Sequence, residues 1–327
     1  MRILITAPYN KQGRDKLASV LGEVVYREWK EMGRAYNEDE LNRLIDETGA
    51  DALITEHDMV TAGVINAHPH LQFIGVCRGT PSNVDIDAAA LKEIPVFHTP
   101  ARNAQAVAEM FIANVINLMR NTIPSWQWLS GKNWGEGAHT SYLQFKGNEL
   151  AGKTIGMVGF GAVGQRIAEV VKSFPCKIKF YDPFIENVNP DYEKTSLEDI
   201  FKSSDIVSIH LPANTKTIGM IDKSLISKMK PDAIFVNTAR ASVVKRDDLL
   251  EALENNRIRG AVLDVFDHEP PDETDYKLIN HPNVLATPHT AGATHEVEDH
   301  HVTILNDKIL NWASSNKINN YKHIQTT

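Results

Sequence analysis

The sequence predicts an α/β fold in which two parallel sheets are covered by helices. Short apolar runs alternate with helical patterns along the chain, as expected for parallel strands, which need long crossover connections. A glycine-rich turn at residues 159–164 directly follows one apolar run and precedes a helical pattern. The length of 327 residues predicts two domains, because single hydrophobic cores rarely grow that large.

The composition argues against several classes of partner. The formal net charge is −8 without a basic stripe, which argues against nucleic acid. The two cysteines, Cys77 and Cys176, are far apart in the sequence, so neither a disulfide framework nor a metal site is predicted. The first residues, MRILITAPYN, lack a signal-peptide pattern, and no apolar run is long enough to cross a membrane. We therefore expect a cytoplasmic location and no membrane partner.

The first third of the chain alternates short strands with helices. Asn37 and Glu40 have the spacing of a capping box, which predicts a helix that begins at Asn37. The other expected helices are residues 13–21, 61–67 and 87–92, and the expected strands are 2–7, 24–26, 52–55, 71–77 and 96–98. This alternation predicts a parallel sheet with helices on both faces.

A boundary is expected at residues 99–103, before a long helix at 104–120. That helix is apolar nearly all round, so we expect it to be buried between domains or against another subunit. Residues 121–147 contain three tryptophans and several glycines, and we interpret them as an irregular interface arm rather than a domain core.

The second half of the chain continues the strand and helix alternation. Strands are expected at 155–158, 178–181, 204–211, 233–237, 260–265 and 284–286, and helices at 165–173, 247–255 and 294–312. The resulting organisation is a Rossmann-like nucleotide domain, residues 101–289, inserted into a flavodoxin-like substrate domain, residues 1–100 plus 290–327. Residues 104–147 form the expected dimerisation arm.

Residues 159–164, GFGAVG, form a complete G-x-G-x-x-G motif between a strand and a helix. Gly159 permits the tight turn, Gly161 lets a pyrophosphate approach the backbone, and Gly164 lets the helix pack against the strand. The N–H groups and partial positive charge of the helix N-terminus favour phosphate. The motif therefore predicts a dinucleotide site.

Asp182 ends the next predicted strand, 18 residues after Gly164. A carboxylate at this point accepts hydrogen bonds from the ribose hydroxyls and repels a 2′-phosphate. Pro183 and Phe184 follow it and offer no cation for that phosphate. We therefore predict NAD rather than NADP as the cofactor.

Several ordered motifs carry a resemblance to a known family. They are VGFGAVG at 158–164, SIHLPANTKTIGMI at 208–221, NTAR at 237–240, GAVLDVFDHEP at 260–270 and TPHTAGAT at 287–294. With these motifs the chain, over nearly its whole length, resembles the D-isomer-specific 2-hydroxyacid dehydrogenases, which include phosphoglycerate, glycerate and D-lactate dehydrogenases.

The resemblance implies that Arg240, Glu269 and His289 are the catalytic residues. A planar guanidinium suits the carboxylate of a 2-oxo acid, and a histidine can act as acid and as base near neutral pH. A carboxylate paired with that histidine would hold its ring and favour imidazolium. The residues implied to contact NAD are Gly159, Phe160, Gly161, Ala162, Val163, Gly164, Asp182, His210, Pro212, Thr238, Ala239, Asp264 and Gly292.

The substrate loop is less well defined by the sequence. The turn of Arg78, Gly79 and Thr80 resembles the family loop whose backbone N–H groups hold the substrate carboxylate. Arg78 and Arg102 could bind a second anionic group such as a phosphate, or could pair with acidic side chains. His210 could line the cofactor cleft or be part of the buried structure.

Two alanines depart from the family pattern, which usually has glycine in the positions of Ala101 and Ala241. A positive φ at either residue would strain the backbone. Residues 295–301, HEVEDHH, contain metal-binding residue types, but we favour a solvated helix face over a metal site.

We therefore expect an NAD-dependent enzyme that interconverts a 2-hydroxy acid and a 2-oxo acid, acting as a homodimer whose domains close over the ligands. Candidate substrates are 3-phosphoglycerate, glycerate or hydroxypyruvate, and glyoxylate. A formate dehydrogenase is disfavoured, because such enzymes have glutamine in the position of Glu269. A phosphite dehydrogenase-like enzyme and a non-catalytic, NAD-sensing corepressor-like protein remain alternatives.

Overall fold

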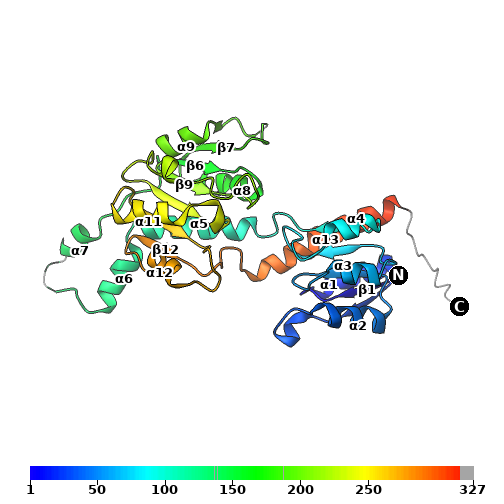
Figure 1. Ribbon diagram of the computed structural model, residues 1–327. Helices are drawn as coiled ribbons and strands as arrows, with labels where there is room; N and C mark the ends of the chain where they lie inside the picture. The colour runs from blue at the N-terminus through cyan, green and yellow to red at the C-terminus, as the bar shows by residue number, and fades with distance from the viewer. Residues whose placement is uncertain (136, 138, 187, 317–327) are drawn as a thin grey trace. The chain divides into compact units, whose positions relative to one another are not determined.

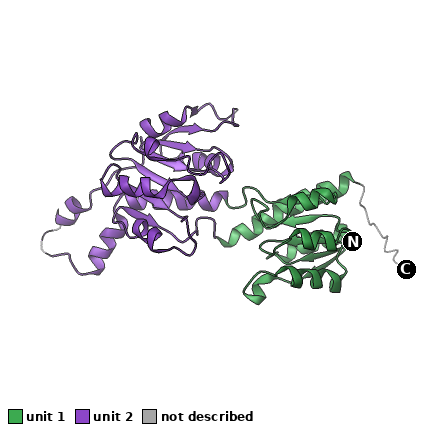
Figure 2. Ribbon diagram, viewed as in Figure 1, with its two compact units in different colours: residues 1–103, 294–327 green, residues 104–293 purple. Residues whose placement is uncertain are grey.

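The computed structural model describes residues 1–316 except 136, 138 and 187 (Figure 1). The chain divides into two units: unit 1 contains residues 1–103 and the chain from Thr294 onward, and unit 2 contains residues 104–293 (Figure 2). The sequence-based divisions were at residues 100 and 289. Both units contain a parallel sheet with helices on both faces, so the predicted α/β fold class is confirmed.

Unit 1 contains a five-stranded sheet in the order β2-β1-β3-β4-β5, which is the flavodoxin-like order. Its strands are β1 (Arg2–Ile5), β2 (Glu23–Tyr26), β3 (Ala52–Thr55), β4 (Ile74–Val76) and β5 (Val96–His98). Its helices are α1 (Lys11–Leu21), the short η1 (Trp29–Met32), α2 (Glu38–Thr48), α3 (Ala62–Ala67), α4 (Ile86–Leu91) and α13 (His295–Ser315).

The period-two pattern of β1 assigns the two faces of this sheet. Leu4 packs with residues of α2, α3 and α4, whereas Ile3 and Ile5 pack with α1 and α13. The predicted capping box is present, because Asn37 Oδ1 accepts from the Glu40 N–H at 3.0 Å and Glu40 Oε2 accepts from the Asn37 N–H at 3.0 Å.

Unit 2 contains a seven-stranded parallel sheet in the order β12-β11-β10-β9-β6-β7-β8. Its strands are β6 (Thr154–Val158), β7 (Lys177–Tyr181), β8 (Tyr192–Lys194), β9 (Ile206–Ile209), β10 (Ile234–Asn237), β11 (Gly260–Leu263) and β12 (Val284–Ala286). The chain runs outward from β6 to β8 and then returns to β9 beside β6. This reversal of strand order is the place where open α/β sheets bind ligands.

Helices cover both faces of the unit 2 sheet. The helices of this unit are α5 (Ala104–Met119), α6 (Thr122–Ser130), α7 (His139–Gln144), α8 (Ala162–Val171), α9 (Leu197–Ser203), α10 (Lys223–Ile226), η2 (Ala241–Val243), α11 (Arg246–Glu254) and α12 (Glu273–Ile279). One core joins α5 and α8 to the sheet, and the other core joins α9, α10, α11 and α12 to its opposite face.

Two expectations about local structure were wrong. The segment 121–147 is not irregular throughout, because it contains α6 and α7, whose sequences lack a periodic apolar face. Helix α5 is largely buried against α8 and the sheet of its own unit, and its burial against another domain or subunit stays a prediction. Helix α8 begins at Ala162 and not at Gln165, because Gly164 belongs to its first turn.

Candidate active site

The glycine turn between β6 and α8 has the backbone geometry that its motif requires. Gly159 has φ +89°, and a Cβ there would lie 2.8 Å from the carbonyl oxygen of His210. A Cβ on Gly164 would lie 2.9 Å from the carbonyl oxygen of Gly159. Glycine is therefore needed at both positions, because the turn and the contact between helix and strand leave no room for a side chain.

The surroundings of this turn fit a dinucleotide. A Cβ on Gly161 would meet nothing within 4 Å, so the backbone can be approached from that side. Gly161 precedes α8 without a side-chain cap, and the first N–H groups of the helix can donate to phosphate. The hydroxyl of Thr238, at the carboxyl end of β10, is buried without a hydrogen-bond partner among the described residues. A nicotinamide dinucleotide could supply partners to these groups.

Asp182, directly after β7, is tied to the glycine turn. Its Oδ2 accepts from the Phe160 N–H at 2.8 Å, and its Oδ1 accepts from the Phe184 N–H at 2.8 Å. These two bonds fix the carboxylate beside the turn, and each oxygen retains acceptor capacity for a ribose hydroxyl.

His210, which follows β9, lies beside the same turn and is partly buried. Its Nε2 lies 2.9 Å from Ser208 Oγ. Burial lowers the pKa of His210 to about 4, so the imidazole is neutral near pH 7. His210 Cδ2 would lie 3.7 Å from a Cβ on Gly164, so the ring packs beside the turn, and its contact with the cofactor stays a prediction.

Arg240 follows β10 on a loop that Asn237 holds in place. Asn237 Nδ2 donates to the Arg240 carbonyl at 2.9 Å, and the Ala239 N–H donates to Asn237 Oδ1 at 3.0 Å. The exposed guanidinium donates to the Ala239 carbonyl at 2.6 Å and forms no ion pair within the described part of the chain. Ala241 does not have a positive φ, so its replacement of the family glycine strains nothing there.

His289 and Glu269 are in direct contact. His289 Nδ1 lies 2.7 Å from Glu269 Oε2, and Glu269 Oε1 accepts from the Phe266 N–H at 3.3 Å. The two side chains are 49% and 41% exposed, so the pair is accessible from solvent. His289 also has φ +54°, an uncommon backbone conformation for a residue with a side chain.

A buried carboxylate supports the loop that carries His289. Asp264 accepts three hydrogen bonds: from Thr287 Oγ1 at 2.5 Å, from the Thr290 N–H at 2.9 Å and from the Ala291 N–H at 2.9 Å. These donors lie on both sides of His289, so Asp264 fixes the strained loop. The family resemblance placed Asp264 among the NAD contacts but did not reveal this contact, which joins segments more than 20 residues apart.

A mainly apolar cavity of about 410 Å³ adjoins the pair. It is lined by Phe266, Glu269, Pro270, Pro271, Tyr276, Ile279, Ala286, Thr287, Pro288 and His289. The carboxyl ends of β6, β7, β10, β11 and β12 meet at one edge of the parallel sheet. This edge brings the glycine turn, Arg240 and the His289–Glu269 pair to the same side of unit 2.

The other predicted cofactor contacts lie in the loops at this edge. The Pro212 carbonyl accepts from Thr217 Oγ1 at 2.6 Å. Gly292 directly follows Ala291, whose N–H donates to Asp264.

The predicted substrate loop belongs to unit 1. The Arg78 carbonyl accepts from the Thr99 N–H at 2.8 Å, and Arg78 Nη1 lies 3.3 Å from His57 Nδ1. Gly79 and Thr80 complete the turn after β4.

Arg102 pairs with an acidic residue, which was one of its two predicted roles. Its Nη1 lies 2.8 Å from Glu56 Oε1, and the side chains are only 18% and 8% exposed. Ala101 has φ +66°, so the departure from the family glycine does strain the backbone at this position.

Two histidines of α13, His300 and His301, contact backbone carbonyls elsewhere in unit 1. His300 Nδ1 lies 3.0 Å from the Arg102 carbonyl, and the buried His301 Nε2 lies 2.7 Å from the Pro8 carbonyl. Burial lowers the pKa of His301. Among the described residues, 295–301 form no cluster of three or more metal-ligating side chains. No described helix has the length and apolar character needed to cross a membrane.

The chain combines a dinucleotide turn with an arginine and a carboxylate–histidine pair at one sheet edge, an arrangement suited to an NAD-binding dehydrogenase. The family model of the D-isomer specific 2-hydroxyacid dehydrogenase, NAD binding domain, matches residues 112–291. The chain belongs to the D-isomer-specific 2-hydroxyacid dehydrogenase family, and it is an NAD-dependent enzyme.

Similar proteins extend this match beyond the nucleotide domain. The chain is 58% identical over 319 residues to "Putative 2-hydroxyacid dehydrogenase YoaD" of Bacillus subtilis, covering 98% of this chain and 93% of that protein. It is 36% identical over 262 residues to hydroxypyruvate reductase of Thermotoga maritima, covering 80% and 83% of the two chains. A similar solved structure is an acyclic imino acid reductase in complex with NADPH and D-Arg, with TM-score 0.80, 26% identity and coverage of 96% and 98%.

Proposed function

We propose that this enzyme reduces a small 2-oxo acid to its D-2-hydroxy acid, with His289 as the proton donor. The observation that carries the proposal is the 2.7 Å contact between His289 Nδ1 and Glu269 Oε2. NADH, when bound, supplies the hydride.

Glu269 gives His289 a defined role in the proposal. A carboxylate at Nδ1 favours the tautomer with a proton on Nδ1, and it stabilises imidazolium. The transferable proton is then on Nε2, which faces away from Glu269. In the reductive direction Nε2 donates to the carbonyl oxygen of the substrate, and in the oxidative direction it removes the hydroxyl proton.

Arg240 binds the substrate carboxylate in this proposal. Its guanidinium is exposed at the sheet edge that carries His289, and within the described residues no acidic side chain neutralises it. The planar fork of donors can make two parallel hydrogen bonds to a carboxylate. Asn237 restricts the loop, so the arginine is presented from a fixed backbone.

We further propose a substrate without a phosphate group. The largely buried Arg102 pairs with Glu56, and releasing it would leave this buried carboxylate without its guanidinium partner, with only the Trp29 Nε1–H at 3.3 Å and His57 Nε2 at 3.7 Å. The relative from Thermotoga maritima is named a hydroxypyruvate reductase, which is consistent with a small plain acid. Hydroxypyruvate and glyoxylate are therefore our leading candidates, ahead of 3-phosphohydroxypyruvate.

The proposal is tested by following NADH absorbance with glyoxylate, hydroxypyruvate, pyruvate and 3-phosphohydroxypyruvate as substrates. Turnover of the plain acids supports it, and turnover of the phosphorylated acid alone contradicts the assignment of Arg102. Binding of NADH without any turnover would instead favour a non-catalytic NAD-sensing protein.

We also propose that residues 104–147 form the interface between two copies of this chain in a homodimer. Helices α6 and α7 project from the sheet of unit 2 (Figure 1), and among the described residues of this segment six large apolar side chains are exposed. They are Ile123, Trp126, Leu129, Trp134, Tyr142 and Leu143. A surface of this kind is typical of subunit interfaces. Sedimentation of the wild type as a dimer supports the proposal, and a monomer at micromolar concentration contradicts it.

A further inference from the structure

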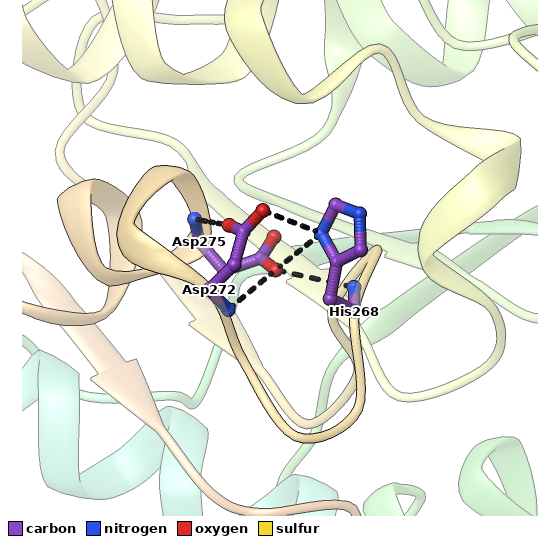
Figure 3. Close-up of side chains that lie close together, drawn as sticks. All are labelled: His268, Asp272 and Asp275. Atoms are coloured by element: carbon purple, nitrogen blue, oxygen red, sulfur yellow. Dashed lines mark hydrogen bonds and ion pairs between the residues drawn. The ribbon is translucent and has the colours of Figure 1, made fainter.

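A cluster of three ionisable side chains lies directly beside Glu269. His268 is the preceding residue, and its Nδ1 lies 3.0 Å from Asp272 Oδ2 and 3.0 Å from Asp275 Oδ2 (Figure 3). Asp272 is the N-cap of α12, and Asp275 belongs to the first turn of that helix. The cluster thus ties the turn that carries Glu269 to the start of α12.

Asp275 makes most of these contacts and is only 1% exposed. Its Oδ2 accepts from the backbone N–H of His268 at 3.1 Å and of Asp272 at 3.3 Å, besides the His268 ring. A cation at this point would compete with these donors for an oxygen whose acceptor capacity is already used. The arrangement is therefore better suited to hydrogen bonding than to metal binding.

Arg246 extends the cluster to the helix that follows the Arg240 loop. Its Nη1 lies 3.3 Å from Asp267 Oδ2 and 3.5 Å from Asp275 Oδ1, and it donates to Thr274 Oγ1 at 2.9 Å. Of the two residues before Glu269, Asp267 is thereby held by an ion pair with Arg246, and His268 is held by its contacts with Asp272 and Asp275. The mechanism proposed above uses none of these side chains.

We propose that Asp275 is a positioning residue, which fixes the turn 266–269 so that the Glu269 carboxylate meets His289. This inference rests on the proposed function. The buried Asp275 carboxylate holds both the backbone and the ring of His268. In this proposal it thereby fixes the direction in which the side chain of Glu269, the next residue, leaves the turn. Loss of that group lets Glu269 move, and small displacements of catalytic groups can reduce rates about a hundredfold.

The test is a double-mutant cycle on the full-length protein, with Asp275→Ala, Glu269→Ala and the combination. Asp275→Ala should lower kcat at least about tenfold and change the KM of the 2-oxo acid and the affinity for NADH less than about threefold. In the Glu269→Ala background the same substitution should cost less than about twofold. An equal loss in both backgrounds overturns the proposal, because it would mean that Asp275 acts independently of Glu269.

Two further variants separate positioning from stability. Asp275→Asn keeps an oxygen that can accept from His268, so it should restore most of kcat. Asp205→Ala is a matched control at the opposite edge of the sheet, where Asp205 accepts from the Thr154 N–H at 2.8 Å and pairs with Lys230 at 2.9 Å. It should lower the melting temperature without changing kcat per NADH-binding site.

A crystal structure of the Asp275→Ala variant gives a readout that needs no substrate. The proposal expects the Glu269 carboxylate to have left the 2.7 Å contact with His289. An unchanged contact overturns the proposal even if the enzyme is active. Absence of wild-type turnover combined with a displaced Glu269 would contradict the proposed function and leave the positioning role supported.

Discussion

Glu269→Gln tests the contact on which the proposed mechanism depends. The substitution keeps the size of the side chain and its hydrogen-bonding ability, but it removes the charge that stabilises a protonated His289. A hydrogen bond to a charged group contributes about 1.5–3 kcal/mol. Because both side chains are nearly half exposed, solvent screens the pair, and we expect the lower part of this range, about 1.5–2 kcal/mol. This corresponds to a loss of about 10–30-fold in kcat.

The assay is steady-state reduction of a 2-oxo acid by NADH, with kcat and KM determined separately. We expect KM to change little, since Glu269 contacts His289 and is not assigned to the substrate. The matched control is Glu254→Gln, which replaces an exposed carboxylate at the end of α11 and should leave kcat and KM unchanged. A kcat loss of less than about threefold, or a change confined to KM, would refute the reasoning.

Three other predictions concern the cofactor, pH and backbone strain. Asp182→Ala should reduce the preference for NADH over NADPH, measured as the ratio of kcat/KM values, by at least about tenfold; an unchanged ratio contradicts the ribose assignment. The pKa of His210 is lowered from 6.5 to about 4, so the unfolded state binds a proton more readily. The contribution of neutral His210 to the free energy of unfolding should therefore be complete above pH 6.5 and should decrease as the pH drops toward 4, with about 2 kcal/mol lost by pH 5. Denaturant unfolding of the wild type at several pH values measures this loss, and the His210→Asn variant should lack it. Ala101→Gly should raise the free energy of unfolding by about 0.5–1 kcal/mol, because it relieves φ +66°, whereas Ala241→Gly should not; equal effects would show that strain is not the cause.

Local sequence patterns predicted the parts of the fold that depend on neighbouring residues. The alternation of apolar runs and helical patterns predicted the parallel sheets, and strands β3, β5 and β12 have the predicted bounds. The Asn37–Glu40 box and the glycine turn were also predictable, because capping and tight turns are properties of a few consecutive residues.

The parts that were missed depend on contacts between distant segments. Helix α12 is an exception: it was not expected because its acidic sequence has a short apolar face, and the contact of its Asp275 with His268 joins residues only seven positions apart. The pairing of Arg102 with Glu56 joins residues 46 positions apart, so the sequence left both roles of Arg102 open. The contact of His289 with Glu269 was implied by family resemblance and not by the local pattern, because its residues belong to different loops.

The most direct test of the proposed function is the oxidation of NADH by hydroxypyruvate and glyoxylate, comparing the wild type with His289→Ala. The proposed mechanism predicts turnover by the wild type and a loss of at least about a hundredfold in the variant, with NADH affinity nearly unchanged. Activity of the variant within about tenfold of the wild type would contradict the assignment of His289 as the proton donor.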